Sequence, residues 1–151
     1  MKKPDLNNNI GYLFNTVTNA LNTFMQREIT QHDIEVPFEQ LKLLMFISFH
    51  EGVNQQLICS KMNKAKPGIS RLVDSLVKKK LVDRREDQED RRNKKLFATE
   101  KGIELRNRFY PIGFSNLQSI ESELGEQESA ELKKHLIAIK EIILNRLNTE
   151  K

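Results

Sequence analysis

The sequence predicts a mainly α-helical fold with one small β-hairpin. Apolar residues recur at intervals of three and four along most of the 151-residue chain, a spacing typical of amphipathic helices. Two short strand-like runs, residues 81–85 and 94–98, flank a segment at 86–93 that contains no apolar residue. Such a segment has no place in a core, so the hairpin is expected to project into water or onto a charged partner.

The first helices follow from periodicity and from residues suited to helix ends. Apolar spacing predicts a first helix over about residues 7–29. A second helix begins at Pro37, because proline is accepted in a first turn, and Gly52 ends it. Asn54 is a suitable N-cap for a third helix. The residues of this helix that are expected to face the core are Leu57, Ile58 and Met62.

A fourth predicted helix shows the most regular pattern in the chain. Its apolar residues share one face at spacings of three and four, and they are Ile69, Leu72, Val73, Leu76 and Val77. Pro67 fits the first turn of this helix. The opposite, polar face offers its side chains to solvent or to a ligand, and it consists of Lys66, Ser70, Arg71, Asp74, Ser75 and Lys78.

Two long helices are expected at the C-terminal end. Thr99 caps the first of them, and Pro111 and Gly113 are expected to kink it or to divide it into two segments. The last helix, at about residues 126–147, has a wider apolar face than one core contact requires. Together with the apolar first helix, this favours packing of both chain ends against a second subunit. The alternative is a well-buried monomer core.

Positive charge is concentrated in the middle of the chain. The whole chain carries 25 Lys and Arg against 21 Asp and Glu, a net charge of +4. Residues 61–101 alone carry 14 basic and 7 acidic residues, whereas residues 1–60 and 102–151 are slightly acidic. Concentrated basic charge is typical of a surface that binds a polyanion. The alternative is a solvated basic surface.

Several function classes find no support in the sequence. No apolar run reaches the roughly 18 residues of a membrane span and the N-terminus is polar, so we expect a cytoplasmic protein without a membrane partner. The single Cys59 excludes an internal disulfide and is expected to be a buried core residue. His32, His50 and His135 lie on separate predicted segments, so no metal or other cofactor is expected. Without a phosphate-binding glycine loop or a nucleophile motif, the chain is not expected to be an enzyme.

The order of the central elements is that of a DNA-binding arrangement. A helix, a tight turn, an amphipathic helix and a charged hairpin form a winged helix-turn-helix, whose second helix fits the major groove. This block resembles the MarR-type regulators, and the resemblance extends along the whole chain. The segments that carry it are Ile69-Ser70-Arg71-Leu72-Val73-Asp74-Ser75-Leu76, Leu81-Val82-Asp83-Arg84-Arg85, the Asp-x-Arg element at Asp90 and Arg92, and Thr99-Glu100-Lys101-Gly102.

The resemblance implies an organisation and a function. It implies one domain over residues 1–151, with dimerisation helices at about 1–36 and 100–151 and a winged helix-turn-helix lobe at about 37–99. It also implies a homodimer that binds a pseudo-palindromic operator in double-stranded DNA, usually represses transcription, and is released by a small-molecule effector. The alternative is a winged-helix protein-interaction module that has lost sequence-specific DNA binding.

The resemblance further assigns DNA contacts. Ser70 and Arg71 would read bases, while Arg92 would enter the minor groove in an orientation set by Asp90. The full set of predicted DNA-contacting residues is Lys64, Lys66, Ser70, Arg71, Arg84, Asp90, Arg91, Arg92 and Lys94.

Two departures from the family pattern bear on these assignments. Pro67 and Gly68 stand where a Ser or Thr pair is frequent, which removes two hydroxyl groups from the start of the reading helix. Lys80 stands where a glycine commonly ends that helix. The helix is therefore expected to end differently.

Overall fold

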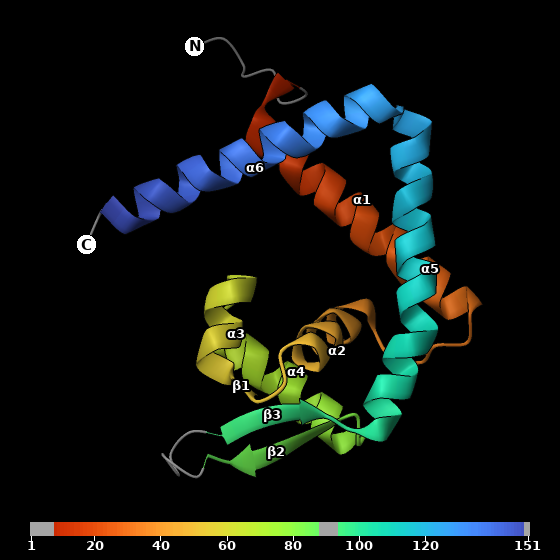
Figure 1. The fold of residues 1–151 in the computed structure, drawn as a ribbon, viewed down its shortest axis with the longest axis vertical. Coiled ribbons are helices and arrows are strands. Elements are labelled where there is room, and N and C mark those ends of the chain that lie inside the picture. Colours follow the sequence, from red (N-terminus) through yellow and green to blue (C-terminus); the bar gives the residue numbers. More distant parts are fainter. Residues whose placement is uncertain (1–7, 88–93, 150–151) are drawn as a thin grey trace. The chain divides into compact units, whose positions relative to one another are not determined.

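The described residues, 8–87 and 94–149, form six helices and three short strands in a computed structural model (Figure 1). The elements in chain order are α1 (Ile10–Gln31), α2 (Phe38–Phe49), β1 (Val53–Asn54), α3 (Gln55–Met62), α4 (Lys66–Lys78), β2 (Val82–Glu86), β3 (Lys94–Ala98), α5 (Glu100–Leu124) and α6 (Glu126–Thr149). The predicted mainly helical class with a β-hairpin is confirmed. The chain divides into two compact units, Met1–Ile112 and Gly113–Lys151, which are described separately below.

Side-chain caps set the starts of three helices. Asn9 Oδ1 accepts a hydrogen bond from the backbone N–H of Tyr12 (3.1 Å), and α1 begins directly after it. Asn54 Oδ1 accepts one from the N–H of Leu57 (2.8 Å) at the start of α3. Thr99 Oγ1 accepts one from the N–H of Gly102 (3.0 Å) at the start of α5. Each bond satisfies an N–H group that the helix itself leaves without a partner, so the predicted caps at Asn54 and Thr99 are confirmed.

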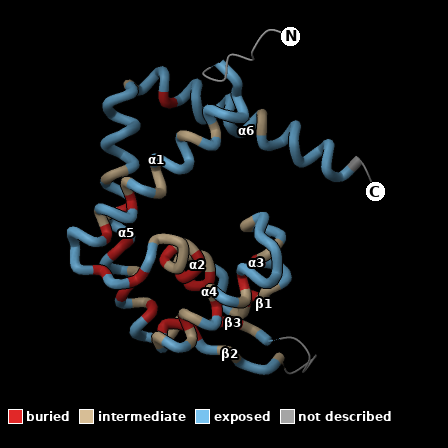
Figure 2. Tube along the Cα trace, turned by 180° about the vertical axis from the view of Figure 1, so that it is seen from behind, coloured by how far each residue is buried: buried red, intermediate tan, exposed pale blue. Residues whose placement is uncertain are grey.

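The core of the first unit is centred on α2 and α4 (Figure 2). Ile69, Val73 and Leu76 of α4 are fully buried, as its amphipathic pattern predicts. The α2 residues in this core are Leu41, Leu43, Leu44 and Ile47. In α3 only Ile58 is fully buried, whereas Leu57 is 43% exposed, so the expectation that Leu57 faces the core is wrong.

The hairpin belongs to a three-stranded antiparallel sheet with the order β1-β3-β2. In β2, Val82 pairs with Ala98 and Arg84 pairs with Leu96, so the buried Val82 and Leu96 attach the base of the hairpin to the core. The strand β1 was not predicted. It contains only two residues, and Val53 pairs with Leu96.

A left-handed residue ends α4. Lys80 has φ +58°, its N–H donates to the carbonyl oxygen of Val77 (2.9 Å), and the N–H of Leu81 donates to that of Leu76 (2.9 Å). This bond pair forms a Schellman motif, which usually has glycine at its left-handed position. The end of α4 therefore has the hydrogen bonds of a common helix terminus, but a lysine occupies the position where glycine is usual.

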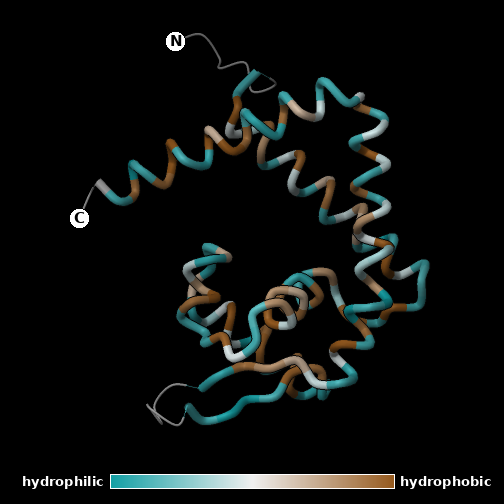
Figure 3. Tube along the Cα trace, viewed as in Figure 1, coloured by the Kyte–Doolittle hydropathy of each residue, from teal (hydrophilic) through white to brown (hydrophobic). Residues whose placement is uncertain are grey.

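The second unit contains the C-terminal part of α5 together with α6. The helix α5 runs without interruption through Pro111, so of the two expected outcomes, a kink or a division, the division into two segments is wrong. Hydrophobic residues recur along α6 (Figure 3), yet nearly all residues of this helix are exposed. The large apolar side chains exposed in this unit are Phe114, Leu117, Ile120, Leu124, Leu132, Leu136, Ile137, Ile142, Ile143, Leu144 and Leu147. Among the described residues, no helix has the length and apolar character that a bilayer crossing needs.

Candidate nucleic-acid interface

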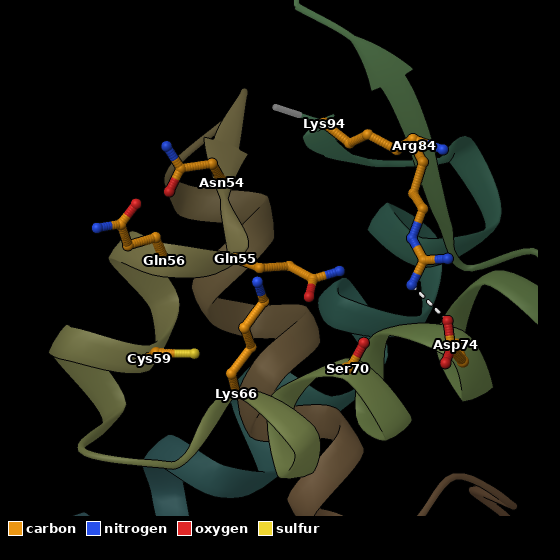
Figure 4. A pocket seen from close by; sticks show the side chains of 9 residues that line it. All are labelled: Asn54, Gln55, Gln56, Cys59, Lys66, Ser70, Asp74, Arg84 and Lys94. Carbon is orange, nitrogen blue, oxygen red and sulfur yellow. Dashed lines mark hydrogen bonds and ion pairs between the residues drawn. The ribbon is translucent and has the colours of Figure 1, made fainter. Parts of the chain in front are cut away.

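Helices α3 and α4 and the hairpin line a cavity of about 570 Å³ (Figure 4). Its lining residues are Asn54, Gln55, Gln56, Cys59, Lys66, Ser70, Asp74, Arg84 and Lys94. Four of the predicted DNA-contacting residues are in this set: Lys66, Ser70, Arg84 and Lys94. The structure thus brings together basic side chains from the start of α4 and from the two strands of the hairpin, which are separated along the sequence.

The N-terminal turn of α4 forms one side of the cavity. Lys66 is the first residue of α4 and its side chain extends beside Gln55, while Ser70 lies one turn further along (Figure 4). The N-cap residue Ala65 provides no side-chain hydrogen bond to the first N–H groups of the helix. A helix N-terminus carries a partial positive charge and is a ready binding site for phosphate oxygens. Lys66 adds a full charge at the same place.

An ion pair joins the reading helix to the base of the wing. Arg84 Nη2 of β2 donates a hydrogen bond to Asp74 Oδ1 of α4 (Figure 4). The Arg84 side chain is 28% exposed, and its position in β2 opposite Leu96 directs it toward α4. The ion pair therefore joins the base of the hairpin to α4.

The two faces of the hairpin differ in what their cations contact. Lys94 lines the cavity. Its neighbour Lys95 forms an ion pair with Asp87 (3.2 Å), and the Arg85 guanidinium lies 4.4 Å from the centre of the Phe97 ring. Because successive residues of a strand point to opposite faces, only Lys94 of this lysine pair belongs to the cavity surface.

The remaining predicted site residues lie elsewhere. Arg71 is exposed on α4 and does not line the cavity. Lys64 also lies outside the cavity, where its Nζ is 3.2 Å from Glu39 Oε2. The predicted wing-tip residues Asp90, Arg91 and Arg92 fall outside the described residues.

The Glu39 carboxylate has a perturbed acidity. A hydrogen bond from Lys42 is the largest cause that holds the pKa of Glu39 below its usual value, and Lys64 adds to it. Partial burial acts in the opposite direction and is outweighed. Glu39 is therefore ionised at neutral pH and neutralises positive charge beside the reading helix.

Cys59 differs from its expected place. It is only partly buried, and it lines the cavity while packing against the core on its other side. Cys59 therefore packs against the core, as expected, but it is less buried than expected. The short helix α3 buries Ile58 alone, which leaves the next residue at the edge of the core.

The cavity also contains neutral amides that the sequence reasoning missed. Gln55 and Gln56 come from the first turn of α3, and Asn54 is its N-cap. Amide side chains hydrogen-bond to phosphates and to adenine edges. Because these side chains are neutral, the charge pattern of the sequence does not identify them. The available signal is their position at the start of the helix that precedes α4.

Comparison with known proteins gives the family. The family model described as MarR family matches residues 32–93. The chain is 32% identical to the HTH-type transcriptional regulator MhqR of Bacillus subtilis (strain 168) over 111 residues, which are 72% of this chain and 74% of that protein.

Solved structures agree with this assignment. The chain is similar to MepR of S. aureus in a complex with DNA, with 26% identity, a TM-score of 0.80, and coverage of 89% of this chain and 98% of that one. The transcriptional regulator SlyA shares the fold at 19% identity, with a TM-score of 0.84 over 95% of this chain and 99% of that one. The chain therefore belongs to the MarR family of winged helix-turn-helix transcriptional regulators.

Proposed function

We propose that this protein is a homodimeric repressor that binds a pseudo-palindromic operator in double-stranded DNA and catalyses no reaction. One observation carries the proposal: Lys66, Ser70, Arg84 and Lys94 gather on one surface around the N-terminus of α4. A basic concave surface with an exposed helix start fits a phosphate backbone and an adjoining major groove. MepR, at 26% identity, has been solved bound to DNA, which supports the same ligand for this chain.

The proposed roles of the residues follow from charge and position. Lys66 and Lys94 bind phosphates and fix the position of α4, contacts that carry no sequence information. Arg84 joins the base of the hairpin to α4 through its ion pair with Asp74. Ser70 and Arg71 read base edges: Arg71 is exposed on α4, and the half-buried Ser70 lines the cavity. Arg92, oriented by Asp90, enters the neighbouring minor groove, and Arg91 contacts phosphates beside it.

The proposed dimer rests on apolar surface. Ile10, Leu13 and Val17 of α1 are 58%, 44% and 64% exposed, and the exposed apolar residues of α5 and α6 add to them. Exposed apolar surface of this kind is typical of an interface between protein chains. A two-fold dimer presents two reading helices, which is what a pseudo-palindromic operator requires.

Release of the operator by a small-molecule effector is also part of the proposal. Such a ligand acts by favouring a conformation in which the two α4 helices are wrongly spaced for the half-sites. With DNA as its ligand, the protein is expected to act in the cytoplasm.

The test is selection of bound sites from random DNA, with wild-type protein and with Arg71→Ala. We expect the wild type to select a two-fold symmetric motif whose half-sites are about one helical turn apart. Arg71→Ala should weaken the preference for one base at one position of the site. The difference in binding free energy between the preferred base and the others should fall by roughly 1–3 kcal/mol. An asymmetric motif would contradict the dimer. An absence of DNA binding even at low salt would favour the protein-interaction module instead.

A further inference from the structure

Lys64 lies close to the proposed DNA surface but is held by a carboxylate of its own chain. It belongs to the turn between α3 and α4, two residues before the first residue of α4, Lys66. Asn63 has φ +49°, and the N–H of Lys64 donates to the carbonyl oxygen of Cys59 (3.1 Å), which fixes the backbone of the turn. The Lys64 Nζ lies 3.2 Å from Glu39 Oε2 of α2.

Glu39 is itself held in place by Lys42, which has further contacts of its own. Its Oε1 accepts a hydrogen bond from Lys42 Nζ (2.5 Å), one turn further along α2. Lys42 Nζ also donates to Asn22 Oδ1 of α1 (3.2 Å) and lies 4.9 Å from the centre of the Phe38 ring. The second carboxylate oxygen is therefore presented to Lys64 by a preformed set of contacts.

We propose that Glu39 lowers the affinity of this protein for DNA by competing with a backbone phosphate for Lys64. This inference rests on the proposed function, because it assumes that the N-terminal end of α4 faces DNA. The side chains of Lys64 and Glu39 are 40% and 42% exposed. A pair this exposed is weak and is exchanged readily for another anion.

Competition at Lys64 has a thermodynamic signature. A lysine that meets a phosphate releases a condensed counterion, and each such contact steepens the fall of log affinity against log salt by about 0.9. While Lys64 is paired with Glu39, this contribution is reduced. Removal of the carboxylate charge should therefore both strengthen DNA binding and steepen its salt dependence.

The effect should be independent of sequence, because a phosphate contact positions the protein without reading bases. The test therefore uses full-length protein and a duplex of random sequence, with affinity measured from low salt to about 0.15 M salt. The central variant is Glu39→Gln, which keeps the size of the side chain and removes its charge. The matched control is Glu51→Gln on the same lobe, because Glu51 is exposed and forms no ion pair among the described residues.

We expect Glu39→Gln to bind DNA about three- to tenfold more tightly near 0.15 M salt, with a salt slope steeper by up to about 0.9 for each protomer. Glu51→Gln should change affinity much less and leave the slope unaltered. In a Lys64→Ala background, Glu39→Gln should lose its effect. Circular dichroism confirms that each variant is folded.

The outcomes separate this inference from the proposed function. Equal gains in DNA affinity for Glu39→Gln and Glu51→Gln would show a general effect of charge. That result would overturn the inference and leave the proposed function intact. A gain for Glu39→Gln that persists in the Lys64→Ala background would also overturn it, since the effect would not pass through Lys64. If wild-type protein binds no duplex at low salt, the proposed function fails and the inference fails with it.

Discussion

The hydroxyl of Thr99 donates a hydrogen bond to the carbonyl oxygen of Lys80 (2.8 Å), and so links the end of the reading helix to the start of α5. The same hydroxyl accepts a hydrogen bond from the N–H of Gly102 (3.0 Å). The backbone N–H of Thr99 donates to the carbonyl oxygen of Leu81 (3.1 Å). One residue thus satisfies polar groups at a helix C-terminus and a helix N-terminus together.

Replacement of Thr99 should destabilise the first unit. Thr99→Val keeps the shape of the side chain but leaves the Lys80 carbonyl and the Gly102 N–H without this partner. We expect the free energy of unfolding to fall by about 1–2 kcal/mol, the usual cost of a lost N-cap. Denaturant unfolding measures the change. Thr99→Ser retains the hydroxyl and should lose less than half as much; an equal loss for both variants would show that the methyl group, not the hydroxyl, is responsible.

Lys80→Gly should stabilise the protein. Lys80 adopts φ +58°, a conformation that costs a residue with a Cβ about 1 kcal/mol and costs glycine little. We therefore expect an increase of about 0.5–1 kcal/mol in the free energy of unfolding. Arg71→Gly is the control, because Arg71 is exposed in the interior of α4, where glycine is unfavourable by about 1 kcal/mol. Changes of the same sign in the two variants would contradict the conformational explanation.

Two glycines should respond in opposite ways to alanine. A Cβ at Gly102 would overlap the carbonyl oxygen of Leu81, which the bond from Thr99 holds in place. We expect Gly102→Ala to lower the free energy of unfolding by more than about 2 kcal/mol. A Cβ at Gly68, in the first turn of α4, meets no atom within 4 Å. Gly68→Ala should therefore raise the free energy of unfolding by about 0.5 kcal/mol. Thermal or denaturant unfolding compares them, and a tolerated Gly102→Ala would show that α5 can shift away from Leu81.

The contribution of Glu39 to stability should vanish in acid. Hydrogen bonds from Lys42 and then Lys64 place its pKa in the folded state below the ordinary 4.5, so the folded protein binds fewer protons than the unfolded chain. The contribution is therefore complete above pH 4.5 and is lost as the pH falls through the lower, folded pKa. At pH 7 the free energy of unfolding of the wild type should exceed that of Glu39→Gln. The difference should be less than about 1 kcal/mol, because the ion pair between Lys64 and Glu39 is exposed. Urea unfolding at pH 7 and pH 3 tests this, and a difference that is unchanged at pH 3 would contradict it.

The helices could be predicted because their signals are local. The spacing of Ile69, Val73 and Leu76 defines the buried face of α4, and the caps at Asn54 and Thr99 act within three residues. The strand β1 gives no such signal, since two residues carry no periodicity and its partner lies far along the chain. The inward placement of Leu57 was wrong because the short helix α3 buries only one position.

The resemblance to the MarR-type regulators accounts for the part of the cavity lining that could be predicted. It assigned Lys66, Ser70, Arg84 and Lys94, and these residues line one cavity. Gln55 lacks charge and was missed. The pairing of Lys64 with Glu39 was not visible either, because contacts between α2 and the turn before α4 depend on tertiary packing and not on spacing.

Adjacent lysines on β3 provide a direct test of which hairpin face meets DNA. Lys94 lines the cavity beside α4, whereas Lys95 is on the other face and pairs with Asp87 (3.2 Å). Lys94→Ala and Lys95→Ala remove the same charge one residue apart, so a general electrostatic effect is nearly equal in both. If Lys94 binds a phosphate, its loss should reduce the magnitude of the salt slope by about 0.9 for each protomer and weaken binding about three- to tenfold near 0.15 M salt. Lys95→Ala should change the slope little. Fluorescence anisotropy with a labelled duplex over a range of salt concentrations measures both quantities, and a larger effect for Lys95→Ala would place the DNA on the opposite face of the hairpin.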